Sequence, residues 1–129
     1  RTYYGFRNDN APVLYMPIEE SRFTFTVRVD FNSSTLFDQC GIAIYQDSDN
    51  WFKCGLEYHT EDEGWLGSVV TNHGYSDWAT TEMHAVVRTI WYRLSRRDAD
   101  YLIEYSLDGN TYQQMRIFHL FEGAESINM

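Results

Sequence analysis

The sequence has few basic residues, few cysteines and no long apolar segment. Its 129 residues include 19 acidic and 10 basic side chains, which gives a net charge of −9. Binding to nucleic acids or to acidic membranes needs clustered Lys and Arg, so the charge balance excludes both classes of partner. No apolar run approaches the roughly 20 residues of a membrane-spanning helix. Two cysteines cannot supply the four closely spaced ligands of a zinc site.

The residues that are abundant favour β-structure. Aromatic residues make up 17% of the chain, and there are 7 Val, 7 Ile and 10 Thr against 8 Leu and 6 Ala. Branched and aromatic side chains pack well on a pleated sheet surface. The length suits a single domain, which we predict to span residues 1–129.

Alternation of apolar and polar residues identifies the strands. In Arg22–Phe31, Phe and Val occupy every second position, which is typical of a strand with one buried face. The turn-forming segment Asp47–Asn50 joins two further strands into a hairpin. Tyr75–Trp78 is predicted to be a loop that exposes two aromatic residues, and no amphipathic helix is found. Besides the first strand, the predicted strands are 39–46, 51–58, 65–71, 89–96, 101–106 and 111–118. This pattern predicts an all-β, two-sheet antiparallel sandwich or a barrel.

The hairpin has one apolar face and one face suited to binding. Only a register that places Cys40, Ile42 and Ile44 across from Phe52, Cys54, Leu56 and Tyr58 buries both apolar rows. The opposite face then carries small residues, which can mark a close approach of a ligand to the backbone. Aromatic and hydrogen-bonding side chains surround them, as in many sites for neutral polar rings such as sugars. The small residues are Gly41, Ala43, Gly55 and Ser68, and the predicted ligand-binding residues are Gln39, Tyr45, Trp51, Lys53, Glu57 and Ser68.

The same pattern also has purely structural explanations. Lys53 and Glu57 could form a surface ion pair, and the glycines could mark bulges. Asp47, Asp49 and Asn50 lack the spacing of a calcium loop and are better explained as turn residues. Glycosidase chemistry needs two carboxylates roughly 5–10 Å apart, and no second acid clearly shares a face with Glu57. We therefore predict no metal site, no cofactor and no catalytic residue.

Cys40 and Cys54 fall on the apolar face of their strands. Neighbouring positions of paired strands seldom suit the geometry of a disulfide, so both thiols are predicted to be buried and unbonded. Reduced thiols favour a cytoplasmic location.

Five motifs occur in an order that resembles the bacterial and fungal family named "regulation of enolase"-like. They are Asp38–Gly41, Asp49–Glu57, Ser68–Thr71, Gly74–Trp78 and Glu104–Gly109. The resemblance implies a concanavalin A-like jelly roll. It also implies further strands before and after this region, in line with a β-type pattern that is only beginning at Ser126–Met129. No catalytic residues come with this family, and fold alone is a poor guide to activity.

Three functions are consistent with these features. The first is a non-catalytic module that binds a carbohydrate or another small polar ligand on the open face. The second is a regulatory module that binds a metabolic enzyme through aromatic anchors, with Tyr75, Asp77 and Trp78 at the contact. The third is a glycan-active enzyme that uses Glu57.

Overall fold

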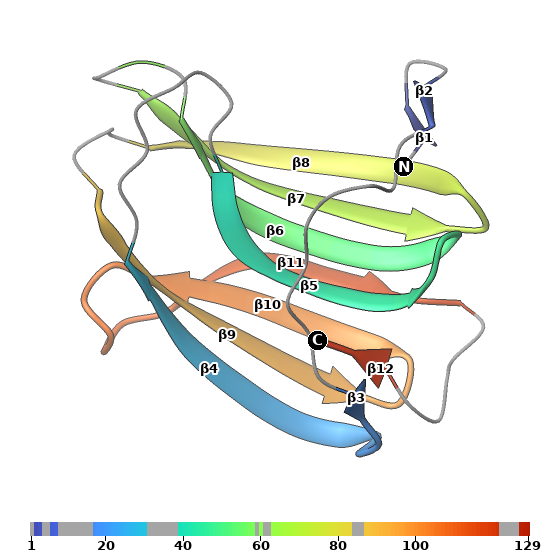
Figure 1. Ribbon diagram of the computed structural model, residues 1–129. Coiled ribbons are helices and arrows are strands. Elements are labelled where there is room, and N and C mark those ends of the chain that lie inside the picture. The colour runs from blue at the N-terminus through green and yellow to red at the C-terminus, as the bar shows by residue number, and fades with distance from the viewer. Residues whose placement is uncertain are drawn as a thin grey trace.

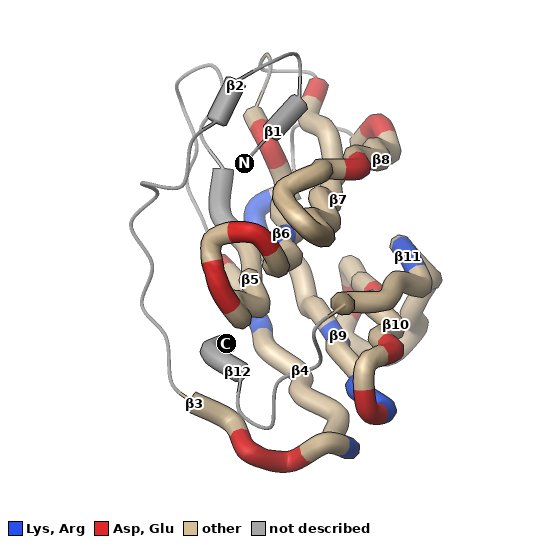
Figure 2. The backbone as a smooth tube through the Cα atoms, turned by 90° about the vertical axis from the view of Figure 1, so that its right-hand side faces the viewer, with Lys and Arg blue, Asp and Glu red and all other residues tan. Residues whose placement is uncertain are grey.

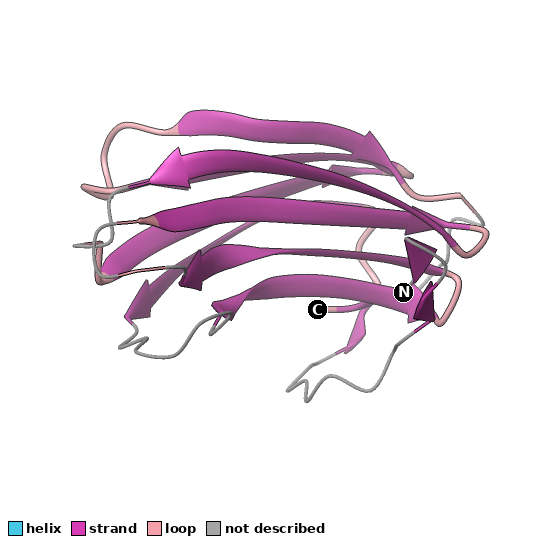
Figure 3. Ribbon diagram, turned by 90° about the horizontal axis from the view of Figure 1, so that it is seen from above, coloured by secondary structure: helices cyan, strands magenta, loops and turns pink. Residues whose placement is uncertain are grey.

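The computed structural model describes residues 2–3, 6–7, 17–30, 39–58, 60, 63–83, 87–121 and 127–129. All elements in this part of the chain are strands (Figures 1 and 3). They form a six-stranded sheet, in the order β3-β12-β5-β6-β7-β8, and a four-stranded sheet, in the order β11-β10-β9-β4. Every strand pair is antiparallel. The two sheets form the two layers of a sandwich (Figure 2), which confirms the predicted fold class.

The larger sheet consists of β3 (Pro17–Ile18), β12 (Ile127–Asn128), β5 (Gln39–Asp47), β6 (Asn50–Tyr58), β7 (Gly64–Asn72) and β8 (Tyr75–Met83). The smaller sheet consists of β11 (Gln113–His119), β10 (Asp100–Ser106), β9 (Thr89–Arg97) and β4 (Arg22–Asp30). A short hairpin of β1 (Thr2–Tyr3) and β2 (Phe6–Arg7) lies beside β8.

The hairpin of β5 and β6 has the predicted register. Cys40 lies opposite Leu56, and Ile42 lies opposite Cys54. Cys54 is buried and has a free thiol, so the prediction that it is not bonded to Cys40 is confirmed. The side chain of Cys40 lies outside the described residues. The strict alternation predicted for the first strand is also present, since the odd-numbered positions from 23 to 29 in β4 are half-buried and the even-numbered ones exposed.

The core lies between the two sheets. Aromatic rings from both layers meet there: Phe52 of β6 stacks on Phe118 of β11 with a centroid distance of 4.2 Å, and Phe118 stacks on Tyr101 of β10 at 5.0 Å. Burial of such large apolar surfaces is the main force that holds the layers together. The other buried apolar residues of the core are Ile44, Cys54, Leu56, Leu66, Val70, Ile90, Tyr92, Leu94, Ile103 and Leu120.

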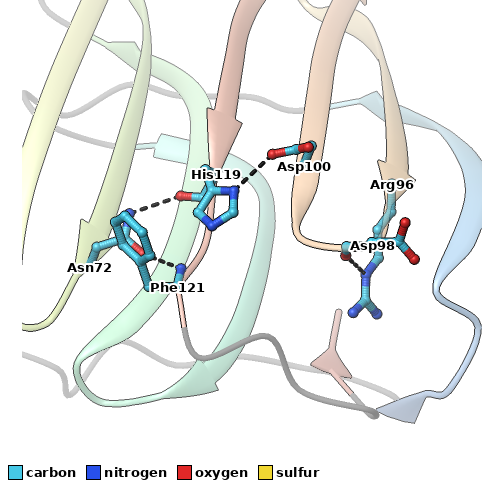
Figure 4. Close-up of polar contacts among 6 residues, drawn as sticks. All are labelled: Asn72, Arg96, Asp98, Asp100, His119 and Phe121. Atoms are coloured by element: carbon cyan, nitrogen blue, oxygen red, sulfur yellow. Dashed lines mark hydrogen bonds and ion pairs between the residues drawn. The ribbon is translucent and has the colours of Figure 1, made fainter.

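Polar contacts join the two layers at one end of the sandwich. Asn72, at the end of β7, donates from Nδ2 to the carbonyl of His119 at 2.8 Å, and its Oδ1 accepts from the amide of Phe121 at 2.7 Å (Figure 4). Gln46 of β5 also donates to the carbonyl of Phe121, at 2.9 Å. Because His119 ends β11, these bonds connect the six-stranded sheet to the four-stranded sheet.

Two turns are built by side-chain carboxylates. Asp47 Oδ1 accepts from the amides of Asp49 and Asn50, both at 2.8 Å, which confirms the turn predicted there. Asp108 Oδ1 accepts from the amides of Asn110 and Thr111 at 2.8 Å. The motif at 104–109 therefore has a structural explanation as the end of β10 and its turn.

One prediction about the strands is wrong. Tyr75–Trp78 is the first part of strand β8 and not a loop. The strand pairs with β7 along its whole length, from Asn72 opposite Tyr75 to Gly64 opposite Met83. Because successive side chains of a strand point to opposite faces, Tyr75 and Trp78 lie on different sides of the sheet.

Candidate functional site on the outer face of the six-stranded sheet

The outer face of the six-stranded sheet is the face turned away from the core. Strand pairing arranges its residues in four rows that run across β5, β6, β7 and β8. The Trp51 row contains Tyr45, Trp51, Thr71 and Ser76. The Lys53 row contains Ala43, Lys53, Val69 and Trp78. The glycine row contains Gly41, Gly55, Gly67 and Thr80. The Glu57 row contains Gln39, Glu57, Trp65 and Glu82.

The register places five of the six predicted ligand-binding residues on this face. The outer positions of β6 are, in order, Trp51, Lys53, Gly55 and Glu57. The side chains of Trp51, Lys53 and Glu57 are half-buried. Tyr45 is 40% exposed. Gln39 lies opposite Glu57 in the backbone register, and its side chain lies outside the described residues. Whether the side chains of Trp51, Lys53 and Glu57 converge on one ligand stays a prediction.

The placement of Ser68 on this face is wrong. Ser68 lies opposite Cys54, is only 3% exposed and faces the core. Leu66 and Val70, which share its parity, are buried as well. A shift of one residue moves every side chain of a strand to the other face, and the sequence assignment of β7 was off by that one residue.

The corrected register brings in two residues that the sequence reading missed. Gly67 extends the glycine row into β7, and Trp65 joins the Glu57 row. The rings of Trp65 and Trp78 lie 6.3 Å apart and are tilted by 40°. Trp65 Nε1 donates to Glu63 Oε1 at 2.8 Å, which fixes the orientation of its ring. The two indoles thus lie on either side of the glycine row at β7 and β8.

The glycine row is partly required by the fold itself. A Cβ atom on Gly41 would lie 1.8 Å from the carbonyl oxygen of Cys54 and 2.6 Å from the Cα of Gly55, so no side chain fits there. A Cβ atom on Gly67 would lie 3.2 Å from Trp78 Nε1. Close strand approach explains Gly41, and contact with the indole explains Gly67. These two glycines therefore give no independent evidence for a ligand.

A second acid does lie on the same face as Glu57. Glu82 of β8 occupies the same cross-strand row, two strands away, which corresponds to a backbone separation of roughly 10 Å. Trp65 lies between the two carboxylate-bearing positions. The Glu57 row thus contains two acids, as a glycosidase needs, but Trp65 lies between Glu57 and Glu82.

The residues predicted for a partner contact do not form one surface. Tyr75 is 81% exposed on one side of β8, and Trp78 is 44% exposed on the other. The carboxylate of Asp77 pairs with Arg116 of β11 at 2.7 Å, which connects the edges of the two sheets. Asp77 thus has a structural role.

The thiol of Cys54 is not an activated nucleophile. Burial raises the pKa of the Cys54 thiol to about 12, which keeps it protonated and a poor nucleophile. Within the described ranges, no group of three or more His, Cys, Asp or Glu residues could hold a metal ion. The same part of the chain contains no helix long and apolar enough to cross a membrane.

Arg93 of β9 and Glu104 of β10 form a cross-strand ion pair on the four-stranded sheet. Arg93 donates from Nε and one terminal nitrogen to the two carboxylate oxygens of Glu104, at 2.9 and 3.0 Å. Its guanidinium lies 4.0 Å from the ring centre of Tyr112. This ion pair is structural and lies far from the outer face of the six-stranded sheet in the fold, since it belongs to the opposite layer.

Comparisons with known proteins agree with this description. The chain is 34% identical over 116 residues to "Regulation of enolase protein 1" of Saccharomyces cerevisiae, covering 90% of this chain and 57% of that protein. A crystal structure of a functionally unknown protein from Saccharomyces cerevisiae matches with a TM-score of 0.86 and 31% identity, covering 98% of this chain and 66% of that one. The chain therefore spans less than two thirds of the length of either relative.

A more distant structural match supports the fold alone. The GH43 protein BlXynB of Bacillus licheniformis has a TM-score of 0.61 at 20% identity, over 82% of this chain and 20% of that one. Residues 1–129 match the model of the family described as "Protein of unknown function (DUF1349)". The match covers the whole sequence, and together with the yeast relative it shows that this chain belongs to the DUF1349 family.

Proposed function

We propose that the outer face of the six-stranded sheet is a non-catalytic binding site for a carbohydrate or another small polar ligand. The observation that carries this proposal is the arrangement of the four rows. Trp78, which is 44% exposed, and Trp65 lie beside a glycine row, and the hydrogen-bonding side chains Lys53 and Glu57 lie on either side of that row. Indole rings pack on the C–H surface of a sugar, and the polar groups orient its hydroxyls.

A glycan array followed by calorimetry on the best glycan tests the proposal. Trp78→Ala should weaken binding by about 1–3 kcal/mol, as expected for the loss of an aromatic anchor. Gly55→Val should block the glycine row, and its urea midpoint reports whether the fold is kept. Tyr75→Ala is the matched control, because it removes an exposed ring from the other side of the same strand. If Trp78→Ala and Gly55→Val bind as well as the parent, the outer face is not the site.

A second candidate is a regulatory module that binds a metabolic enzyme. The name of the yeast relative, "Regulation of enolase protein 1", favours it and specifies enolase as the enzyme to test. The chain spans only 57% of that relative, so residues outside the shared region could carry the contact. Calorimetry of this chain with purified enolase should then show binding that Tyr75→Ala weakens and Trp78→Ala does not. Absence of binding would rule this candidate out for the region studied.

We do not extend the proposal to catalysis, because Trp65 lies between the positions of Glu57 and Glu82. We do propose that residues 1–129 act as one domain in the cytoplasm. Residues of both sheets share one core, and the free thiol of Cys54 is compatible with a reducing compartment. Recovery of the full-length protein in a membrane or secreted fraction would contradict this location.

A further inference from the structure

Lys53 is the only lysine in the chain, and it lies at the centre of the outer face. Its side chain is half-buried between Ala43 and Val69, its neighbours across the strands. Neither neighbour can accept a hydrogen bond through its side chain. A lysine stem that packs on apolar neighbours turns its ammonium group away from the sheet, where an acceptor on a ligand can reach it.

The ion pairs found among the described residues involve cations other than Lys53. Arg22, Arg28, Arg93 and Arg116 each form an ion pair with a carboxylate. Lys53 forms no ion pair or hydrogen bond with any residue that the structure describes, although the chain contains 19 acidic residues and 10 basic ones. The one lysine of this acidic protein thus has no counter-charge among the described residues, and it lies on the face proposed for ligand binding.

A second donor without a partner lies next to Lys53. Trp51 Nε1 is buried and makes no hydrogen bond within the described part of the chain. Trp51 and Lys53 point to the same face from positions two residues apart, so their Cα atoms are separated by roughly 7 Å. Because Trp51 Nε1 is buried, the donor available to a ligand is the ammonium of Lys53, whereas the Glu57 row, beyond the glycine row, carries the carboxylates of Glu57 and Glu82.

This asymmetry points to a ligand with an acceptor group at one end and hydroxyl donors at the other. The rows of Lys53 and Glu57 are roughly 13 Å apart along β6, a span that one sugar ring and two long side chains can fill. A single ammonium balances one negative charge, which a carboxylate carries and a phosphomonoester exceeds. The neighbouring Glu57 and Glu82 disfavour any further negative charge.

We propose that the ligand of the outer face is a carboxylate-bearing sugar of the uronate type. Its carboxylate pairs with Lys53, its hydroxyls donate to the Glu57 row, and its ring lies over Gly55 beside Trp78. This assignment rests on the function proposed above and names the class of ligand. An acidic peptide is a poorer fit, because the face of a sheet offers no free backbone groups to pair with an extended chain.

Matched acidic and neutral glycans test the assignment. The probes are oligogalacturonate and hyaluronan oligosaccharides, each with its carboxyl-reduced counterpart, which keeps the rings and loses the charge. We expect the parent protein to bind at least one acidic form ten-fold or more tightly than its reduced form. Lys53→Met should abolish that preference, and Lys53→Arg should keep most of it. Arg97→Met, which removes an exposed cation from the other sheet, should change nothing.

The unique lysine provides a second measurement that needs no variant. Acetic anhydride modifies Lys53 and the chain terminus, and mass spectrometry of the peptide that contains Lys53 reports its reactivity. The acidic glycan should protect Lys53 from acetylation, and the carboxyl-reduced glycan should not. Equal reactivity with and without a bound acidic glycan would overturn the pairing with Lys53, even if Lys53→Met fails to fold.

The outcomes separate this inference from the proposed function. Equal binding of acidic and reduced glycans, with loss of both in Trp78→Ala, overturns the carboxylate assignment and leaves carbohydrate binding intact. Tighter binding of a sugar phosphate or of polyglutamate also overturns it. If no glycan in either form binds, both the assignment and the proposed function fail.

Discussion

Replacing Asn72 by alanine should destabilise the whole sandwich, because its side chain joins the two sheets. The amide contacts two backbone groups at the end of β11 and just beyond it, the carbonyl of His119 at 2.8 Å and the N–H of Phe121 at 2.7 Å (Figure 4). Asn72→Ala removes both hydrogen bonds, so that only water can satisfy the two backbone groups.

The expected loss can be worked out from these contacts. A hydrogen bond contributes a net 0.5–1.5 kcal/mol or so, which gives about 1–3 kcal/mol for two. Asn72 is half-buried, but His119 and Phe121 are exposed, so water can replace part of what is lost. We therefore expect a decrease in the free energy of unfolding of about 1–2 kcal/mol.

Urea unfolding followed by tryptophan fluorescence measures this decrease. With a slope of roughly 1–3 kcal/mol/M for a small protein, the midpoint should fall by roughly 0.5–1 M with an unchanged slope. Asn110→Ala is the matched control, since the side-chain amide of Asn110 makes only one long contact, 3.5 Å to the carbonyl of Asp108. Its effect should stay within about 0.5 kcal/mol. Equal effects of the two substitutions, or none from Asn72→Ala, would refute the role of Asn72 in joining the sheets.

Three further predictions concern residues away from the outer face. Cys54, whose pKa burial raises to about 12, should resist iodoacetamide at mildly alkaline pH in the folded protein and react after unfolding, as read by mass spectrometry. Gly109→Ala should lower the free energy of unfolding by about 1–2 kcal/mol, because its φ is +80° and the new Cβ would lie 3.0 Å from the ring of Trp91; an unchanged urea midpoint would contradict this. Hydrogen bonds from the amides of Thr111 and Asn110 hold the pKa of Asp108 below the ordinary value of an aspartate, so its stabilising contribution is fully present above that ordinary value and is lost as the pH falls through the folded pKa. Asp108→Asn should therefore make stability less steeply dependent on pH in acid than in the parent, and parallel curves would contradict that prediction.

The fold could be predicted because burial leaves a clear pattern in most strands. Arg22–Asp30 alternates strictly, and the apolar rows of β5 and β6 allow only one register. Strand β8 was not predicted from the sequence because it is an edge strand and few of its residues are buried. From Tyr75 to Met83, seven of nine residues are exposed, so no apolar period marks it.

The residues that β5 and β6 contribute to the candidate site could be predicted, whereas those of β7 could not. Both parities of Trp65–Thr71 contain large apolar residues, so periodicity alone does not tell which face is buried. The choice of which β7 residues face the core is set by the turn between β6 and β7, because Tyr58 and Gly64 pair directly and close that turn. Once Tyr58 and Gly64 are paired, Gly67 must lie opposite Gly55, and Ser68 must face the core.

The case for a ligand depends on residues whose positions the fold does not require. Gly41 cannot carry a side chain because the backbone of β6 is too close, so Gly41→Ala would disturb the sheet whether or not a ligand exists. Loss of binding in that variant would say nothing about the site. Lys53 and Trp78 differ in this respect, since neither a half-buried lysine without a counter-charge nor a 44% exposed indole adds obvious stability. Substitutions at Lys53 and Trp78 that change binding but leave the urea midpoint unchanged would therefore separate a functional surface from a merely structural one.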